Sequence, residues 1–131
     1  VECGVSGRFH WVSSAEDMVA VYNGLDLLVS VSVSEGFPNV IGEAMSCGLR
    51  CVVTPSGDSA RLVGDSGAVV PVGGIEAVAD AAVSLLGDAG PISLPSPRHR
   101  IVHEFGVAAL IERTEAALGM LLSRPRRRPA G

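Results

Sequence analysis

A short apolar run that leads directly into a turn and an amphipathic helix is the feature that most constrains the fold of this chain. The run Asp26-Leu27-Leu28-Val29-Ser30-Val31 has the length and apolarity of a buried parallel strand. Pro38 cannot continue a strand and Asn39 is a favourable N-cap, so a helix is predicted over residues 39–47, with Gly48 ending it. A buried strand that leads into a helix is the repeating unit of parallel α/β sheets.

The same alternation continues along the chain, which has 131 residues, 47% of them apolar. This length suits one domain, and alternating strands and helices predict an α/β fold with a parallel, doubly wound, Rossmann-like sheet. We expect a loose segment over residues 1–7 and a disordered Arg/Pro-rich tail over 124–131. The predicted strands cover residues 8–12, 26–31, 50–54 and 68–71, and the predicted helices cover 16–23, 39–47, 58–63, 75–87 and 98–123, the last broken at Gly106.

Two carboxylates, Glu35 and Glu43, stand on either side of Pro38. Glu35 falls in the strand-to-helix loop and Glu43 on about the first turn of the helix, at the carboxyl ends of the strands, where open α/β sheets bind ligands. The helix start offers backbone N–H groups to an anion, most naturally a phosphate. A carboxylate such as Glu43 can accept both hydroxyl protons of a ribose diol. The alternatives are a loop glutamate at a turn and a solvated glutamate that complements the helix dipole.

The segment from Glu35 to Glu43, with Ala44-Met45-Ser46-Cys47-Gly48 after it, resembles the signature of retaining glycosyltransferases of the GT-B fold. Among these it is similar to the large family that builds lipopolysaccharide, capsule and glycolipid sugars. The resemblance extends over most of residues 8–122. It implies that residues 8–123 are a partial nucleotide-sugar-binding domain, the incomplete C-terminal domain of a GT-B enzyme with its closing C-terminal helices.

The resemblance implies a role for each residue of the signature. Glu35 matches a glutamate near the donor sugar ring, so it is the expected catalytic residue, binding sugar hydroxyls and stabilising an oxocarbenium-like transition state. Glu43 matches the residue that holds the donor ribose. Thr54, Gly57 and Asp58 follow the next strand and either border the pocket or form an ordinary turn. Contacts to the sugar, diphosphate and ribose are expected from Gly36, Phe37, Pro38, Asn39 and Val40.

By this resemblance the chain is the donor-binding part of a retaining glycosyltransferase that moves a sugar from a UDP- or GDP-sugar to a saccharide or lipid-linked acceptor. The alternatives are a non-catalytic nucleotide-sugar-binding fragment and an isomerase similar to nucleotide-sugar 2-epimerases. In the family, the Arg and Lys that grip the diphosphate, two strands and an acceptor-binding domain precede the segment matching Arg8. We therefore expect a chain truncated at its N-terminus, which needs an N-terminal domain as partner and transfers no sugar alone.

Composition and the motifs absent from the sequence indicate which cofactors, partners and cellular location to expect. No Asp-x-Asp motif offers ligands to a metal on the diphosphate, and His99 and His103 have no third ligand nearby, so neither a metal nor another cofactor is expected. Eleven acidic residues against three Arg in residues 1–97 argue against a nucleic-acid partner. Three cysteines and no membrane-length apolar run predict a cytoplasmic protein. Its Arg-rich tail is either solvated or in peripheral contact with anionic lipid at the inner face of the membrane.

The missing strands imply a further expectation about the sheet. In the order 3-2-1-4-5-6, the retained strands are the third to the sixth, so the strand at residues 8–12 loses its native neighbour. The strand at 26–31 then has an open apolar edge. We expect either a rearrangement that brings residues 8–12 beside 26–31, or self-association in which another chain completes the sheet. The burial of Phe9 and Trp11 depends on which of the two occurs.

Overall fold

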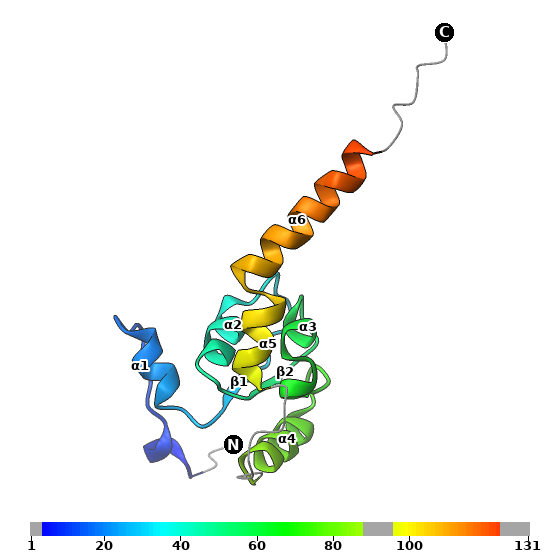
Figure 1. Cartoon of the computed structure of the whole chain (residues 1–131). Coiled ribbons are helices and arrows are strands. Elements are labelled where there is room, and N and C mark those ends of the chain that lie inside the picture. Colours follow the sequence, from blue (N-terminus) through cyan, green and yellow to red (C-terminus); the bar gives the residue numbers. More distant parts are fainter. Residues whose placement is uncertain (1–3, 88–95, 124–131) are drawn as a thin grey trace.

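The computed structural model describes residues 4–87 and 96–123 and contains a small parallel sheet (Figure 1). Its strands are β1 (Leu28–Ser30), β2 (Cys51–Val53) and β3 (Ala68–Val69), in the order β1-β2-β3. Val29 is in register with Val52, and Val53 with Val69. The predicted α/β class with a parallel sheet is confirmed. The helices are α1 (Met18–Asn23), α2 (Asn39–Ser46), α3 (Ser59–Val63), α4 (Ile75–Gly87), α5 (Pro97–Glu104) and α6 (Val107–Leu122), with 3-10 turns at Ser6–Arg8 and Gly64–Ser66.

The hydrophobic core lies around β2, whose three residues are all buried because α2, α3 and α4 pack against this central strand. α2 contributes Ile41, Ala44 and Met45, and α1 contributes Tyr22, which is 3% exposed. Cys51 is also buried, and burial raises the pKa of its thiol to about 12. A thiol with so high a pKa is protonated at neutral pH, so Cys51 acts as a small buried residue of the core.

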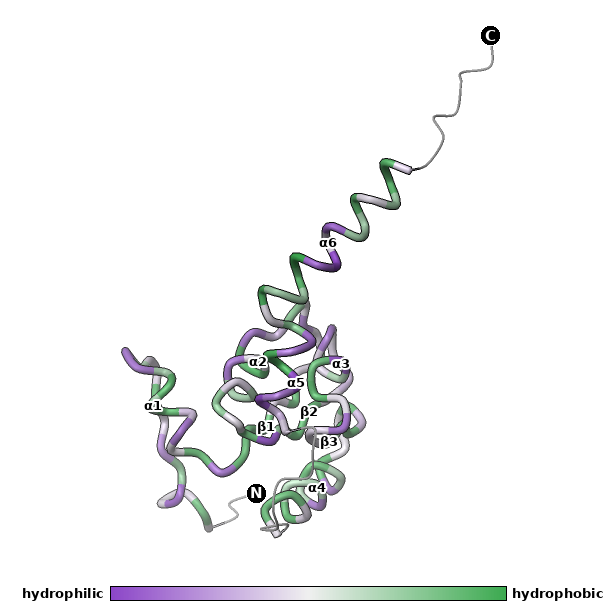
Figure 2. Tube along the Cα trace, in the orientation of Figure 1, coloured by the Kyte–Doolittle hydropathy of each residue, from purple (hydrophilic) through white to green (hydrophobic). Residues whose placement is uncertain are grey.

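The two C-terminal helices differ in their packing. α5 packs against α2, between α2 and α3 in Figure 1, whereas α6 projects away from the body. The predicted break at Gly106 is confirmed, because Gly106 is the N-cap of α6 and a Cβ there would come within 2.3 Å of the Val102 carbonyl oxygen. In the described structure α6 has no buried residue, although apolar turns recur along it (Figure 2).

The prediction of a strand at residues 8–12 is wrong. Ser6–Arg8 forms a 3-10 turn and the following residues are irregular. Phe9 is 59% and Trp11 91% exposed, and their rings stack on each other with centroids 6.1 Å apart. An extended segment becomes a strand only when a neighbour receives its backbone hydrogen bonds, and residues 8–12 have no such neighbour within the described ranges.

The expected rearrangement beside β1 is wrong as well, because in the part of the chain that the structure describes β1 pairs only with β2. Completion of the sheet by another chain stays a prediction. The helix prediction at residues 39–47 needs a smaller correction, since Pro38 is the N-cap of α2 and Asn39 its first helical residue. The expected tail at 124–131 and part of the expected loose segment, residues 1–3, lie outside the described residues.

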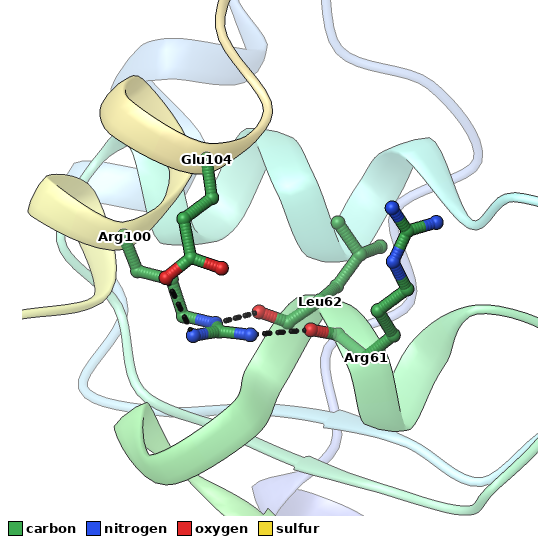
Figure 3. Close-up of polar contacts among 4 residues, drawn as sticks. All are labelled: Arg61, Leu62, Arg100 and Glu104. Atoms are coloured by element: carbon green, nitrogen blue, oxygen red, sulfur yellow. Dashed lines mark hydrogen bonds and ion pairs between the residues drawn. The ribbon is translucent and has the colours of Figure 1, made fainter. Parts of the chain in front are cut away.

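Arg100 of α5 joins the C-terminal helices to the sheet unit (Figure 3). Its Nε donates to the Leu62 carbonyl at 2.8 Å and its Nη2 to the Arg61 carbonyl at 2.7 Å, while Nη1 bonds Glu104 Oε1 at 2.8 Å. The last carbonyls of a helix have no partner within the helix, so the guanidinium caps the C-terminus of α3. Its side chain is only 17% exposed, and the hydrogen bonds to Leu62 and Glu104 are partly buried, whereas that to Arg61 is exposed.

Replacement of Arg100 by Lys tests this cap. Lys keeps the charge but cannot reach two carbonyls and a carboxylate as a planar fork, so we expect a loss of about 1.5–3 kcal/mol in the free energy of unfolding. Urea denaturation followed by far-ultraviolet circular dichroism measures it. Arg113→Lys on the exposed surface of α6 is the matched control and should change stability by less than about 0.5 kcal/mol. Equal stability of the two variants would show that Arg100 is a solvated surface charge.

Candidate functional site

The loops that follow β1 and β2 meet at the carboxyl edge of the sheet. The Thr54 N–H donates to the Ser30 carbonyl at 3.2 Å, and the Thr54 hydroxyl donates to the Ser32 carbonyl. The Asp58 N–H donates to the Gly36 carbonyl at 3.1 Å. These three hydrogen bonds fasten the loop that carries Glu35 to the loop that follows the central strand.

Gly57 makes the close contact between these loops possible. Its φ is +54°, and a Cβ there would lie 2.1 Å from the Gly36 carbonyl oxygen and 2.5 Å from that of Glu35. Only a residue without a side chain fits both the backbone conformation and the space. The structure thus brings Gly57 and Asp58 against the backbone of Glu35 and Gly36, and Thr54 against Ser32 of the same loop. That these residues border a bound ligand remains a prediction.

Glu35 is exposed and is oriented by a neighbour in its own loop. The Ser32 hydroxyl donates to Glu35 Oε1 at 2.8 Å. Because the Ser32 carbonyl in turn accepts from the buried Thr54, a short chain of hydrogen bonds leads from β2 to this carboxylate. Sequence reasoning missed Ser32, although its place three residues before Glu35 is typical of local side-chain pairing in turns.

Glu43 is exposed on α2, one residue beyond the first turn on which it was expected. Its Oε2 accepts a hydrogen bond of 2.9 Å from the Tyr22 hydroxyl. Burial of the phenol, followed by its hydrogen bond and electrostatic interaction with Glu43 and the influence of Cys47, raises the pKa of Tyr22 to about 12. At neutral pH Tyr22 is therefore a protonated donor, and it uses one of about four acceptor positions of the exposed Glu43 carboxylate.

A cavity of about 220 Å³ lies beside Glu43, with α2 on one side and residues of α3 and of the α5 region on the other. The predicted residues Phe37, Asn39 and Glu43 line it, whereas the other predicted residues do not: Glu35, Gly36, Pro38, Val40, Thr54, Gly57 and Asp58. Sequence reasoning missed the other lining residues. Gly42 and Ser46 follow Asn39 at helical spacing, a signal that could have found them, and the opposite wall is formed by Leu62, Ile101 and Phe105.

The start of α2 is open to an anion from the side of the loop. Pro38 occupies the N-cap and has no side-chain oxygen that could accept from the first N–H groups of the helix. These groups carry the positive end of the helix dipole, which attracts phosphates. Asn39 and Val40, the first two helical residues, stand at this position, as the sequence predicted for a diphosphate contact. The contact itself stays a prediction.

Within residues 4–87 and 96–123, no three His, Cys, Asp or Glu side chains are grouped so that they could hold a metal ion. The rings of His99 and His103 lie side by side on α5, with centroids 4.1 Å apart and planes tilted by 34°. No helix in these two ranges is long and apolar enough to cross a bilayer. The expectation of a reaction without metal or cofactor stays a prediction.

Open parallel α/β sheets bind ligands at this edge, beside the loops that follow the strands, and the start of a helix there suits an anion. Comparison with known proteins identifies the family. The model of the group 1 glycosyl transferases matches residues 1–88, and the chain belongs to this family. The resemblance to retaining glycosyltransferases of the GT-B fold is thereby confirmed, and the small sheet with C-terminal helices is consistent with part of a GT-B Rossmann-like domain.

One curated relative is N-acetyl-alpha-D-glucosaminyl L-malate synthase of Bacillus anthracis. It is 40% identical to this chain over 86 residues. The matched part covers 64% of this chain and 23% of the relative, so the chain spans less than a quarter of that enzyme's length. The likeness therefore concerns one part of that enzyme.

Replacement of Gly57 by Ala tests the contact between the two loops. The new methyl group cannot be accommodated 2.1 Å from the Gly36 carbonyl oxygen, so the loop carrying Glu35 must move. Gly73→Ala is the matched control, because Gly73 also has a positive φ, +77°, but no described atom lies within 4 Å of its Cβ position. We expect Gly73→Ala to cost about 1 kcal/mol of stability through backbone strain alone. Gly57→Ala should cost at least about 1 kcal/mol more, because the clash adds to that strain.

Thermal denaturation and the amide chemical shifts of Glu35 and Gly36 measure the two effects. Equal destabilisation by both substitutions, with unchanged shifts in the loop, would contradict the close contact.

Proposed function

We propose that this chain is the donor-binding part of a retaining glycosyltransferase that moves a sugar from a UDP- or GDP-sugar to a saccharide or lipid-linked acceptor. The observation that carries the proposal is the arrangement around α2. An exposed carboxylate, Glu43, is held by a hydrogen bond at the edge of a cavity, and a helix start without a side-chain cap lies on the same helix. The first suits a ribose diol and the second a diphosphate.

In this proposal Glu35 acts on the sugar. Retention of the anomeric configuration involves a transition state with positive charge on the sugar ring, which a nearby carboxylate stabilises. The hydrogen bonds from Thr54 to the Ser32 carbonyl and from Ser32 to Glu35 fix the carboxylate in advance, and preorganised charge is what such stabilisation requires. Gly36 and Phe37 continue the loop towards α2 and would contact the sugar and the diphosphate.

The name of the curated relative indicates which donors and acceptors to assay. The name of the relative from Bacillus anthracis contains an N-acetylglucosaminyl group and L-malate. Nucleotide-linked N-acetylglucosamine therefore belongs among the donors to be tested, and a small hydroxy acid among the acceptors, beside saccharides and lipid-linked sugars. Cytoplasmic location and peripheral contact with anionic lipid are parts of the same proposal.

The substitution Glu43→Gln tests the ribose assignment. Gln keeps the shape of the side chain but loses the charge, and a hydrogen bond to a charged partner is worth about 1.5–3 kcal/mol. We expect affinity for UDP or GDP to fall by about tenfold or more, with little change in melting temperature because the apolar face of α2 is unaltered. Isothermal titration calorimetry measures the affinity. Wild-type affinity in the variant for both nucleotides would end the ribose assignment.

We further predict that these 131 residues bind the donor without transferring its sugar. Transfer requires donor and acceptor to be held together, and that positioning supplies much of the rate. The chain spans 23% of the relative. The proposal assigns the acceptor to an N-terminal domain, and the Arg and Lys that grip the diphosphate to the segment before the one matching Arg8. Incubation with radiolabelled UDP- and GDP-sugars and the acceptors above should leave the donor intact. Transferred sugar would show that the chain is sufficient, and an epimerised donor would support the isomerase reading instead.

A further inference from the structure

Tyr22 reaches Glu43 from a helix outside the segment that carries the glutamates. It lies in the last turn of α1, and its hydroxyl donates to Glu43 Oε2 at 2.9 Å. The ring is 3% exposed and belongs to the core cluster that includes Ile41 and Met45 of α2. A donor that is fixed in the core thus meets a carboxylate that is exposed at the edge of the cavity.

We propose that Tyr22 is a positioning residue for donor binding, whose hydroxyl holds the Glu43 carboxylate in the orientation that receives both hydroxyls of a ribose diol. This inference rests on the donor-binding function proposed above. It adds α1 to the site and assigns it the task of orienting the carboxylate, while Glu43 itself makes the contact with the nucleotide.

The hydroxyl is explained by its partner and not by packing. The ring alone would fill the same space in the core, and a buried hydroxyl without a hydrogen bond is destabilising. The contact with Glu43 satisfies it. Because the pKa of Tyr22 is raised to about 12, the group is protonated throughout the neutral range, and because a carboxylate only accepts, the direction of the hydrogen bond is fixed.

The effect on binding follows from the freedom of the carboxylate. An exposed glutamate samples several rotamers, and a ligand that needs one of them must overcome the loss of that freedom. A hydrogen bond to an immobile donor restricts the side chain before the ligand arrives. Tyr22 occupies one of about four acceptor positions on the two carboxylate oxygens, which leaves enough for two hydroxyl protons.

The test compares two nucleotides on four forms of the 131-residue chain. UDP and 2′,3′-dideoxy-UDP differ only in the diol, so the ratio of their dissociation constants reports the contact to Glu43. The forms are the parent, Tyr22→Phe, Glu43→Gln and the double variant, with affinities measured by calorimetry or by nuclear magnetic resonance titration. Thr114→Val is the control: it also removes a hydroxyl, one that bonds within the exposed helix α6.

We expect the parent and Thr114→Val to prefer UDP by at least about fivefold, and Glu43→Gln to lose most of that preference, since each lost hydrogen bond to a charged group is worth several-fold in affinity. Tyr22→Phe should reduce the preference about threefold, and the double variant should be no worse than Glu43→Gln, because the tyrosine acts through the glutamate. If Tyr22 had a merely structural role, Tyr22→Phe would weaken the binding of both nucleotides alike and leave the ratio of their dissociation constants unchanged.

The outcomes separate the two levels of the proposal. Full preference for UDP in Tyr22→Phe, together with its loss in Glu43→Gln, overturns the positioning role and leaves the proposed function standing. No preference in the parent, or an unchanged one in Glu43→Gln, overturns the ribose assignment and the positioning role with it.

A second measurement needs neither nucleotide nor the tyrosine variant. The chain contains one Tyr, so its tyrosinate absorbance is unambiguous. Since the interaction with Glu43 contributes to the raised pKa, tyrosinate should appear at lower pH in Glu43→Gln than in the parent. An identical titration curve in the two proteins would mean that the hydrogen bond does not form in solution, and the positioning role would be wrong.

Discussion

The central position of β2 is the constraint on which the rest of this structure depends. All three of its residues pair with β1 on one edge, Val52 and Val53 pair with β3 on the other, and all three are buried. Parallel strands all end at the same edge of a sheet, so the chain must make its turns after β1 and after β2 side by side. The contact of Gly57 with the Glu35–Gly36 backbone is the local result. The candidate site is therefore a consequence of strand order before it is a consequence of any particular polar residue.

The C-terminal segment forms part of the cavity wall opposite α2. Residues that follow the part matched by the family model, above all Arg100, Ile101 and Phe105, attach α5 to α3 and close the cavity beside Glu43. The interaction that holds them is polar, a guanidinium on two helix-terminal carbonyls, whereas the cavity behind it is partly apolar. A hydrogen-bonded clamp of this kind fixes direction as well as distance, which a purely apolar contact between short helices would not.

Most of the local structure could be predicted because it follows from the order of apolar residues. The strand at Leu28–Ser30, the helix after Pro38 and the break at Gly106 are examples. Residues 8–12 show where such reasoning ends. Their alternation is typical of a strand, but a strand exists only with a partner, and local sequence does not reveal whether the partner is present.

The same distinction applies to the candidate site. Glu35, Glu43 and Gly57 could be singled out, since their neighbours indicate loops and helix starts. Tyr22 and Arg100 could not, because an aromatic residue on a helix usually indicates core and an arginine usually indicates a solvated surface. The partner of each is decided by how two helices pack, far apart in sequence.

The two chromophores of this chain report on different parts of the molecule. Its single Trp, Trp11, is 91% exposed and stacks on Phe9 in the irregular N-terminal segment, whereas its single Tyr is in the core with its hydroxyl on Glu43. Tryptophan emission will therefore follow the environment of the first residues and not the packing around the sheet. An unfolding curve recorded by that emission alone describes an irregular segment and not the sheet, and the phenol is the natural optical probe for the site.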